Sequence, residues 1–364
     1  MKRSKASRVS LYDFLHFFRP GKKKKINAKS QRRQNISLVE YSSRLSALAL
    51  EKTLIDSHSR HHSRFPYLRS MFATTQNDFR TLSLEDIKSY LENAGEKSFR
   101  AKQIYEWLWQ KGVGSFDEMT NLSKELRNKL KQDFVIHSLT LDTKQVSSDG
   151  TIKIRFKTFD GHFIEGVLIP ATDRLTACVS SQVGCSLSCK FCATGRMDRK
   201  RNLNFDEIFD QVVLINKEAV TEHGRGLTNI VFMGMGEPLL NYAEMMKAVE
   251  KISSPEGLGM SPRRITVSTA GIAKMIKKLG DDEVRFRLAL SLHAANDTKR
   301  NEIMPINETN DLESLIEALH YFAEKTGNRI SFEYILLDHF NDFVEDARQL
   351  VQICERIPAR VNLI

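Results

Sequence analysis

Apolar residues recur with helical spacing in the stretch that begins near residue 81. Residues 83–95, 98–112 and 121–134 place apolar side chains every three to four positions, and the first two stretches end at a glycine. This spacing is typical of amphipathic helices, and a glycine commonly follows the last turn of a helix. We therefore expect a small, mainly helical domain over residues 80–135.

The pattern then changes to alternation. Residues 150–170 alternate apolar and polar positions around a turn at Asp160 and Gly161, which predicts a β-hairpin that connects the helical domain to the rest of the chain. Between residues 171 and 364, strand-like stretches alternate with helix-like ones. This order predicts an α/β fold in which residues 171–364 form a partial (β/α)6 barrel. The strands are expected at residues 174–181, 229–234, 264–271, 285–294, 329–337 and 359–364, and the helices at residues 205–220, 242–253, 272–280, 311–327 and 344–357.

Composition agrees with this division and qualifies the charge. The chain has 364 residues, of which 41% are hydrophobic, enough for one large domain and a smaller one. No apolar run approaches the roughly 20 residues that cross a bilayer, so we expect no membrane contact. The net charge of +10 suggests an anionic partner. However, residues 1–70 alone carry 17 Lys and Arg against 4 Asp and Glu, so the excess positive charge belongs to this tail.

The basic tail leaves three interpretations open. Its runs of Lys and Arg and its few long apolar stretches are typical of a disordered segment. It is compatible with an organelle transit segment, with a non-specific RNA-binding arm, or with an over-long translation start for which Met71 is the natural beginning. A secretory signal is disfavoured, because Asp13 and His16 interrupt the apolar run near the N-terminus.

Three of the five cysteines stand within eight residues. Cys185, Cys189 and Cys192 follow the first predicted strand of the barrel, in the short stretch CSLSCKFC. Loops after parallel strands carry the active sites of barrels, and thiolates in a short loop are the usual ligands of iron–sulfur clusters. Three thiolates would leave one iron of a four-iron cluster open. The alternative is a structural zinc site, but such a site normally has two Cys-x-x-Cys halves, and the sequence contains no second half.

The motifs around these cysteines resemble those of a known superfamily. C-x-x-x-C-x-F-C, with Phe191 before the third cysteine, resembles the radical S-adenosylmethionine (radical SAM) superfamily, as do FMGMGEPL, VSTAG and LSLHA after the next three predicted strands. The longer strings CVSSQVGCSLSCKFCATG, NIVFMGMGEPL, ITVSTAGI and VNLI resemble the RlmN/Cfr family of RNA methyltransferases, over about residues 82–364. We adopt the branch of this family that methylates C2 of adenine, and the C8 branch stays open.

The resemblance implies two cofactors, a 4Fe-4S cluster and S-adenosylmethionine (SAM). In this family one SAM methylates a protein cysteine, a second is cleaved to a 5′-deoxyadenosyl radical, and the methyl carbon is then joined to the adenine. The expected substrates are 23S rRNA and tRNA, contacted in part by the helical domain. The resemblance also implies an external electron donor such as flavodoxin or ferredoxin. We expect a monomer in the cytoplasm, or in an organelle if the tail is a transit segment.

The same resemblance implies roles for individual residues. Cys178 is expected to resolve the protein–RNA adduct and Glu165 to accept a proton. Cys354 has no such match, and its place on the predicted helix over residues 344–357 indicates an ordinary packed cysteine. The cluster ligands are expected to be Cys185, Cys189 and Cys192, and the SAM contacts Gly236, Glu237, Ser268, Ser291, Leu292, His293 and Asn362.

One feature of the family lies beyond the sequence given. The methyl-carrying cysteine of the family follows the sixth strand, whereas this sequence stops two residues after Asn362. We therefore expect a chain truncated at its C-terminus, which cleaves SAM but does not transfer the methyl group. Two other functions stay open, a radical SAM reaction that needs no methylcysteine and a non-catalytic RNA-binding remnant.

Overall fold

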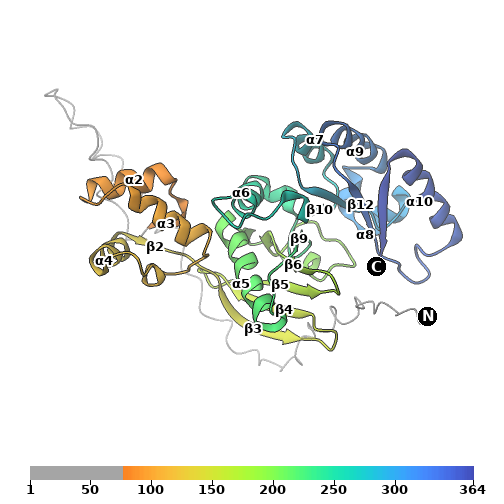
Figure 1. The fold of residues 1–364 in the computed structure, drawn as a ribbon. Coiled ribbons are helices and arrows are strands. Elements are labelled where there is room, and N and C mark those ends of the chain that lie inside the picture. Colours follow the sequence, from red (N-terminus) through yellow and green to blue (C-terminus); the bar gives the residue numbers. More distant parts are fainter. Residues whose placement is uncertain (1–76) are drawn as a thin grey trace, which may run out of the picture. The chain divides into compact units, whose positions relative to one another are not determined.

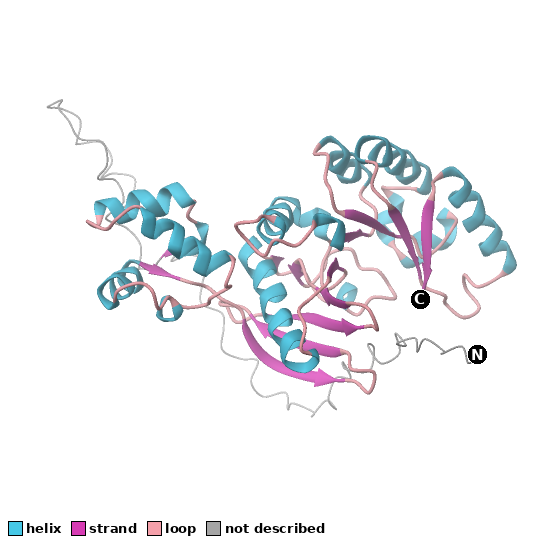
Figure 2. Ribbon diagram, viewed as in Figure 1, coloured by secondary structure: helices cyan, strands magenta, loops and turns pink. Residues whose placement is uncertain are grey.

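The fold is described by a computed structural model for residues 77–364, so the interpretations of residues 1–70 lie outside the described residues. A nine-stranded sheet has the order β13-β12-β11-β10-β9-β6-β5-β4-β3 (Figures 1 and 2). Within this sheet the strands from β6 to β13 are parallel to one another, as a partial barrel requires. They are β6 (Leu175–Cys178), β9 (Asn229–Phe232), β10 (Ile265–Thr269), β11 (Arg287–Ser291), β12 (Ile330–Tyr334) and β13 (Ala359–Leu363).

Helices connect the successive parallel strands, which confirms the predicted α/β order. Helix α8 was not predicted, because its seven residues are too few to show a clear apolar period. The helices are α5 (Phe205–His223), α6 (Tyr242–Ser253), α7 (Ala273–Asp281), α8 (Asp297–Ile303), α9 (Leu312–Thr326) and α10 (Val344–Arg356), with short 3₁₀ turns η3 (Thr194–Arg196), η4 (Pro238–Asn241), η5 (Pro262–Arg264) and η6 (Pro305–Glu308).

An antiparallel extension continues the sheet beyond β6. It consists of β5 (Phe163–Pro170), β4 (Ile152–Lys157) and β3 (Thr140–Val146). The pattern predicted the hairpin of β4 and β5 but not β3. All seven residues of β3 are exposed, so this edge strand has no buried face and leaves no apolar alternation to detect.

The predicted helices before the sheet are present as α2 (Leu84–Asn93), α3 (Phe99–Trp109) and α4 (Lys124–Asp133). Ser83 and Ser123 cap the first and third of these, because each side chain accepts a hydrogen bond from a backbone N–H three residues later. The remaining short elements here are β1 (Asn77–Asp78), η1 (Phe79–Thr81), η2 (Phe116–Glu118) and β2 (Phe134–Val135), and the pair β7 (Gln182–Val183) and β8 (Arg201–Asn202) lies after β6. Within the described residues no helix is both long and apolar enough to cross a bilayer.

A buried ion-pair group ties η1 to α5. Arg80 lies 2.9 Å from Asp206 and 2.7 Å from Asp210, and all three side chains are almost fully buried. Burial raises the pKa of Asp206 to about 7 even though the Arg80 charge opposes the rise. A buried charge without its partner is strongly destabilising, so loss of either Arg80 or its aspartate partners would weaken the contact between η1 and α5.

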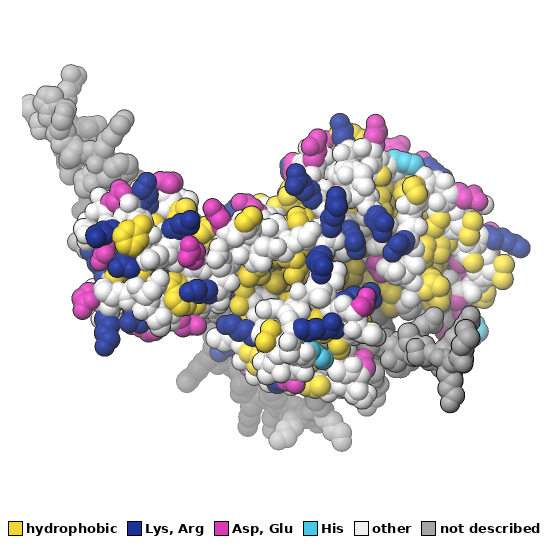
Figure 3. All heavy atoms as spheres, in the orientation of Figure 1, with side chains coloured by type: hydrophobic (Ala, Val, Ile, Leu, Met, Phe, Trp, Pro, Cys, Tyr) yellow, Lys and Arg dark blue, Asp and Glu magenta, His cyan; other side chains and the backbone are white. Residues whose placement is uncertain are grey.

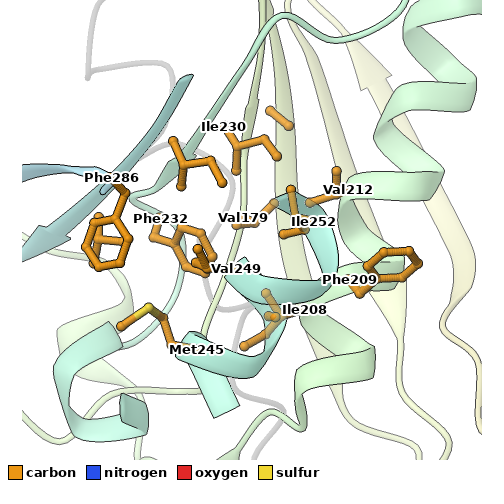
Figure 4. Close-up of a cluster of buried hydrophobic side chains, with 14 of the residues drawn as sticks. Val179, Ile208, Phe209, Val212, Ile230, Phe232, Met245, Val249, Ile252 and Phe286 are labelled. Atoms are coloured by element: carbon orange, nitrogen blue, oxygen red, sulfur yellow. The ribbon is translucent and has the colours of Figure 1, made fainter. Parts of the chain in front are cut away.

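The core that positions the strands lies between the sheet and helices α5 and α6 (Figure 4). Ile230 and Phe232 of β9 are buried there with apolar side chains of both helices. Burying one such side chain contributes about 1.5–3 kcal/mol, so this layer holds β9 against helices α5 and α6. The helical side chains drawn are Ile208, Phe209 and Val212 of α5 and Met245, Val249 and Ile252 of α6.

Candidate active site

Residues 185–192, which we call the cysteine loop, lie beyond the C-terminal ends of the parallel strands. Cys189 is buried, whereas Cys185 and Cys192 are partly exposed. The loop is anchored on the segment around α8, because the backbone N–H of Lys190 donates to the carbonyl of Ile303 at 2.9 Å. A small apolar cluster surrounds this anchor. Its buried members are Cys189, Ala270, Ile303 and Met304, with Leu187, Phe191, Cys192, Ile306, Leu337 and Phe340 packed around them.

The thiols of this loop share one electrostatic neighbourhood. Burial, with smaller contributions from Cys192 and Cys185, raises the pKa of Cys189 to about 12. Burial likewise raises the pKa of Cys185. Isolated thiolates are therefore disfavoured here, and a bound cation that deprotonates its thiol ligands would offset this cost.

The donor set fits a multi-iron cluster better than a single ion. Among the described residues, no three His, Cys, Asp or Glu side chains are close enough to hold one metal ion. Cys185, Cys189 and Cys192 stand on one short loop, where one thiol is buried and two are partly exposed. Thiolates of such a loop are the usual ligands of an iron–sulfur cluster, so these residues fit that group.

Gly236 and Glu237 follow β9 and face the cysteine loop. Gly236 has φ +91°, and a Cβ there would lie 2.4 Å from Cβ of Gln182, so glycine is required. The Glu237 carboxylate is buried and accepts hydrogen bonds from the backbone N–H groups of Leu239 (3.0 Å) and Ala270 (2.7 Å). Each carboxylate oxygen can accept more than one hydrogen bond, so the group retains capacity for a cationic ligand.

The third and fourth predicted SAM motifs lie side by side on β10 and β11. The hydroxyl oxygens of Ser268 and Ser291 are 3.4 Å apart. Leu292 is buried, and His293 adopts φ +56° beyond the strand end. The ring of His293 packs edge-on against Phe191 at 4.6 Å, which joins this strand end to the cysteine loop.

His293 is held as a neutral imidazole. Burial, assisted by the charge of Arg300, lowers its pKa to about 3. Its Nδ1 accepts a hydrogen bond from the backbone N–H of Ile335 at 3.2 Å, so the ring proton resides on Nε2.

Asn362 and Cys178 stand on the two outer strands of the parallel set. Asn362 of β13 donates from Nδ2 to Oε1 of Glu333 at 2.9 Å. Cys178 closes β6, where burial raises the pKa of its thiol to about 12. The candidate residues of the parallel strands therefore lie at or near the C-terminal ends of these strands, as the strand order predicts.

Glu165 lies on the antiparallel extension, not on a barrel strand. Val167, two residues later on β5, lies on the same face as Glu165 and pairs directly with Cys178. Glu165 and Cys178 therefore share one face of the sheet at diagonal positions. The Glu165 carboxylate forms an ion pair with Lys153 at 2.9 Å. Cys354 is on α10 and packs against the main core, away from these residues.

Two buried polar residues near the site were missed by the sequence interpretation. One is Glu333 on β12. The other is Arg300 on α8, whose guanidinium donates to the carbonyls of Ala270 (2.6 Å), Ser291 (3.2 Å) and Leu292 (3.1 Å), and to the side chain of Asn307. Burial lowers the pKa of Arg300 to about 10, so it stays charged at neutral pH. The sequence around Arg300 contains no pattern that would indicate a contact with the ends of β10 and β11, because the helix that carries it is too short to be predicted.

A cavity of about 410 Å³ lies along the inner face of the parallel strands. Val231, Met233, Glu333 and Asn362 line it. Arginines from the N-terminal ends of the strands also line it, namely Arg174, Arg287, Arg329 and Arg360. The cavity therefore extends from Glu333 and Asn362 toward the N-terminal ends of the strands.

The parallel half-barrel and its cysteine loop define a radical SAM enzyme, and comparison with known proteins agrees. The family model described as "Radical SAM superfamily" matches residues 179–351. The model described as "Ribosomal RNA large subunit methyltransferase N-terminal domain" matches residues 78–136. The crystal structure of a radical SAM methyltransferase from Sphaerobacter thermophilus has the same fold, with a TM-score of 0.74 and 40% identity over 79% of this chain and 84% of that one.

Curated relatives narrow the class to one family. A probable dual-specificity RNA methyltransferase RlmN of Cytophaga hutchinsonii is 60% identical over 78% of this chain and 78% of its own length. The dual-specificity RNA methyltransferase RlmN 2 of Myxococcus xanthus is 47% identical over 79% and 77%. This chain belongs to the RlmN family, whose radical SAM chemistry uses a 4Fe-4S cluster and SAM.

Proposed function

We propose that this chain supplies the cluster and SAM sites of an enzyme that methylates C2 of an adenine in 23S rRNA and in tRNA. The names of its relatives support an RNA substrate. The observation that carries the proposal is the meeting of the cysteine loop, the Glu237 carboxylate and the Ser268–Ser291 pair at one edge of the parallel strands. A site of this kind can hold a cluster and SAM next to each other.

The side chains divide the work of binding. Cys185, Cys189 and Cys192 would hold the cluster, which when bound supplies the electron that cleaves SAM. The Glu237 carboxylate would accept hydrogen bonds from the SAM ammonium group, beside the Gly236 turn. Polar and apolar contacts to the rest of SAM would come from Ser268, Ser291, Leu292, His293 and Asn362.

Cys178 and Glu165 are proposed to act on the RNA adduct. Cys178 is a neutral thiol at physiological pH, because burial raises its pKa. The thiol can therefore act as a nucleophile on the protein–RNA adduct only after it has lost its proton to a nearby base. Glu165 shares its sheet face but is paired with Lys153, so proton transfer from RNA to Glu165 would compete with this ion pair.

RNA contacts are proposed for the helical domain over residues 80–135. Over the helical domain in Figure 3, Lys and Arg side chains lie among acidic and apolar ones. Lys102, Lys124 and Lys129 are exposed and form no ion pair within the described residues. Replacing all three with Gln should reduce the slope of log affinity against log salt by about 2–3, as loss of three phosphate contacts requires. An unchanged slope would exclude these lysines from the RNA interface.

The remaining parts of the proposal concern partners and organisation. The domains proposed are the helical domain, the hairpin over residues 150–170 and the barrel over residues 171–364. We propose a monomer that receives its electron from an external donor such as a flavodoxin or ferredoxin. A reducing compartment such as the cytoplasm would keep the thiols of the cysteine loop free to bind the cluster.

The test uses the full-length protein from its gene, reconstituted with iron and sulfide without oxygen. With SAM, dithionite and an rRNA fragment or tRNA, mass spectrometry should detect 2-methyladenosine in the digested RNA. Cys192→Ser should abolish the product and SAM cleavage, whereas Cys354→Ser should retain both. A methyl group found at another atom, or 5′-deoxyadenosine without any methylated RNA, would contradict the proposed reaction.

A further inference from the structure

A row of polar side chains crosses the inner face of the parallel strands. Ser291 of β11 pairs in register with Glu333 of β12, and Glu333 pairs with Asn362 of β13. Ser268 of β10 extends the row, because its hydroxyl lies 3.4 Å from that of Ser291. Three of these four residues are proposed SAM contacts, and Glu333 stands between two of them with no role assigned.

The Glu333 carboxylate is buried but only half satisfied. The side chain of Glu333 is buried, and its Oε1 accepts hydrogen bonds from Ser331 (3.0 Å) and Asn362 (2.9 Å). Its second oxygen, Oε2, has no hydrogen-bond donor among the described residues, and Glu333 lines the cavity. Because Glu333 lines the cavity, its Oε2 can accept a hydrogen bond from a hydroxyl group of a ligand that enters there.

The position of Glu237 indicates which end of SAM reaches Glu333. The Glu237 carboxylate accepts a hydrogen bond from the backbone N–H of Ala270, and Ala270 packs with Cys189, so the amino-acid end of SAM belongs beside the cysteine loop. The nucleoside end must then extend away from the cysteine loop, along the polar row and the cavity. Ribose hydroxyls are hydrogen-bond donors, and the free oxygen of Glu333 is an acceptor.

We propose that Glu333 Oε2 accepts hydrogen bonds from the ribose hydroxyls of SAM, while Oε1 holds the Asn362 amide in place. This inference rests on the proposed function, because it takes SAM as the ligand of the site. It makes Glu333 a cofactor-binding residue, and it explains why a carboxylate occupies the middle of a row otherwise made of neutral side chains.

The first test compares two ligands by equilibrium dialysis with the reconstituted protein. Glu333→Gln keeps the size of the side chain and a carbonyl oxygen for Asn362, but removes the charge. It should weaken SAM and S-adenosylhomocysteine by the same factor, about tenfold, because both carry the ribose and only SAM carries the sulfonium charge. Loss of SAM affinity alone would overturn the proposal in favour of a sulfonium contact, and unchanged affinity for both would overturn it outright.

The matched control and a second measurement separate folding from binding. Glu317→Gln changes an exposed carboxylate on α9 and should leave both affinities and the iron content unaltered. Unmodified protein should bind 2′-deoxy or 3′-deoxy S-adenosylhomocysteine more weakly than the parent compound, and Glu333→Gln should reduce that difference. Equal binding of all three by unmodified protein would refute the ribose contact. Failure of unmodified protein to bind SAM at all would instead refute the proposed function.

Discussion

Arg300 offers a quantitative test of how the site is assembled. It is fully buried and donates to the carbonyls of Ala270, Ser291 and Leu292, which close β10 and β11 next to the cysteine loop. Arg300→Met retains an unbranched apolar stem and removes the donors. The carbonyls of Ala270 and Ser291 and the side-chain oxygen of Asn307 then lose the Arg300 donor, whereas the Leu292 carbonyl still accepts from the backbone N–H of Ala294 at 2.7 Å.

The magnitude follows from these contacts. Each buried acceptor left without a donor costs about 1–3 kcal/mol. Part of this is offset because the substitution no longer buries a charge, a cost visible in the lowered pKa of Arg300. We expect a net loss of about 3–5 kcal/mol in the free energy of unfolding. For a urea slope of about 3 kcal/mol/M, the midpoint should fall by about 1–1.7 M.

The assay is urea unfolding of the iron-free protein, followed by circular dichroism, together with iron retention after reconstitution. Arg300→Met should lower the midpoint and release iron faster, because the Ala270 and Ile303 contacts of the cysteine loop loosen. The matched control is Arg356→Met, which removes an exposed arginine paired with Glu313 and should leave the midpoint unchanged. If both variants unfold at the same urea concentration, the carbonyl contacts do not stabilise this edge and the reasoning is wrong.

Three further predictions concern the same edge of the sheet. Gly236→Ala should cost about 2–4 kcal/mol and weaken SAM binding in a dialysis assay, because the new Cβ meets Gln182 at a φ of +91°; full binding would show that the loop can shift. The pKa of His293 is about 3 when folded against 6.5 when unfolded, so its stability contribution is complete above pH 6.5. That contribution should fall as the pH drops from 6.5 toward 3, by at most about 1.4 kcal/mol per pH unit, and His293→Gln should flatten the acid limb of a stability–pH curve. Iron analysis after reconstitution should give about four irons per chain for the unchanged protein and for Cys354→Ala. Single Ala variants should lose that iron at Cys185, Cys189 and Cys192, and iron retained by any of the three would remove that residue from the ligand set.

Local pattern alone was enough to predict the framework. The alternation of strand-like and helix-like stretches predicted the parallel strands and the helices α5, α6, α7, α9 and α10, because each of these elements buries one face and repeats apolar residues accordingly. The cysteine spacing and the motifs at strand ends led to the radical SAM class before any contact was known. These features depend on residues that are close together in the sequence, so they can be recognised without the fold.

Other features depended on partners far along the chain. Strand β3 has no buried face, and α8 is too short to show a period, so neither leaves a local signature. The importance of Glu333 follows from Asn362, 29 residues later, and from the cavity beside it. Arg300 gains its role from a carbonyl 30 residues earlier. A polar residue reads as exposed until the fold shows which donors and acceptors surround it, because hydrogen-bond satisfaction is decided by neighbours in space. The residue pattern alone therefore led to the class of fold and to the cysteine loop, whereas only the folded chain showed which buried polar groups lie around the candidate site.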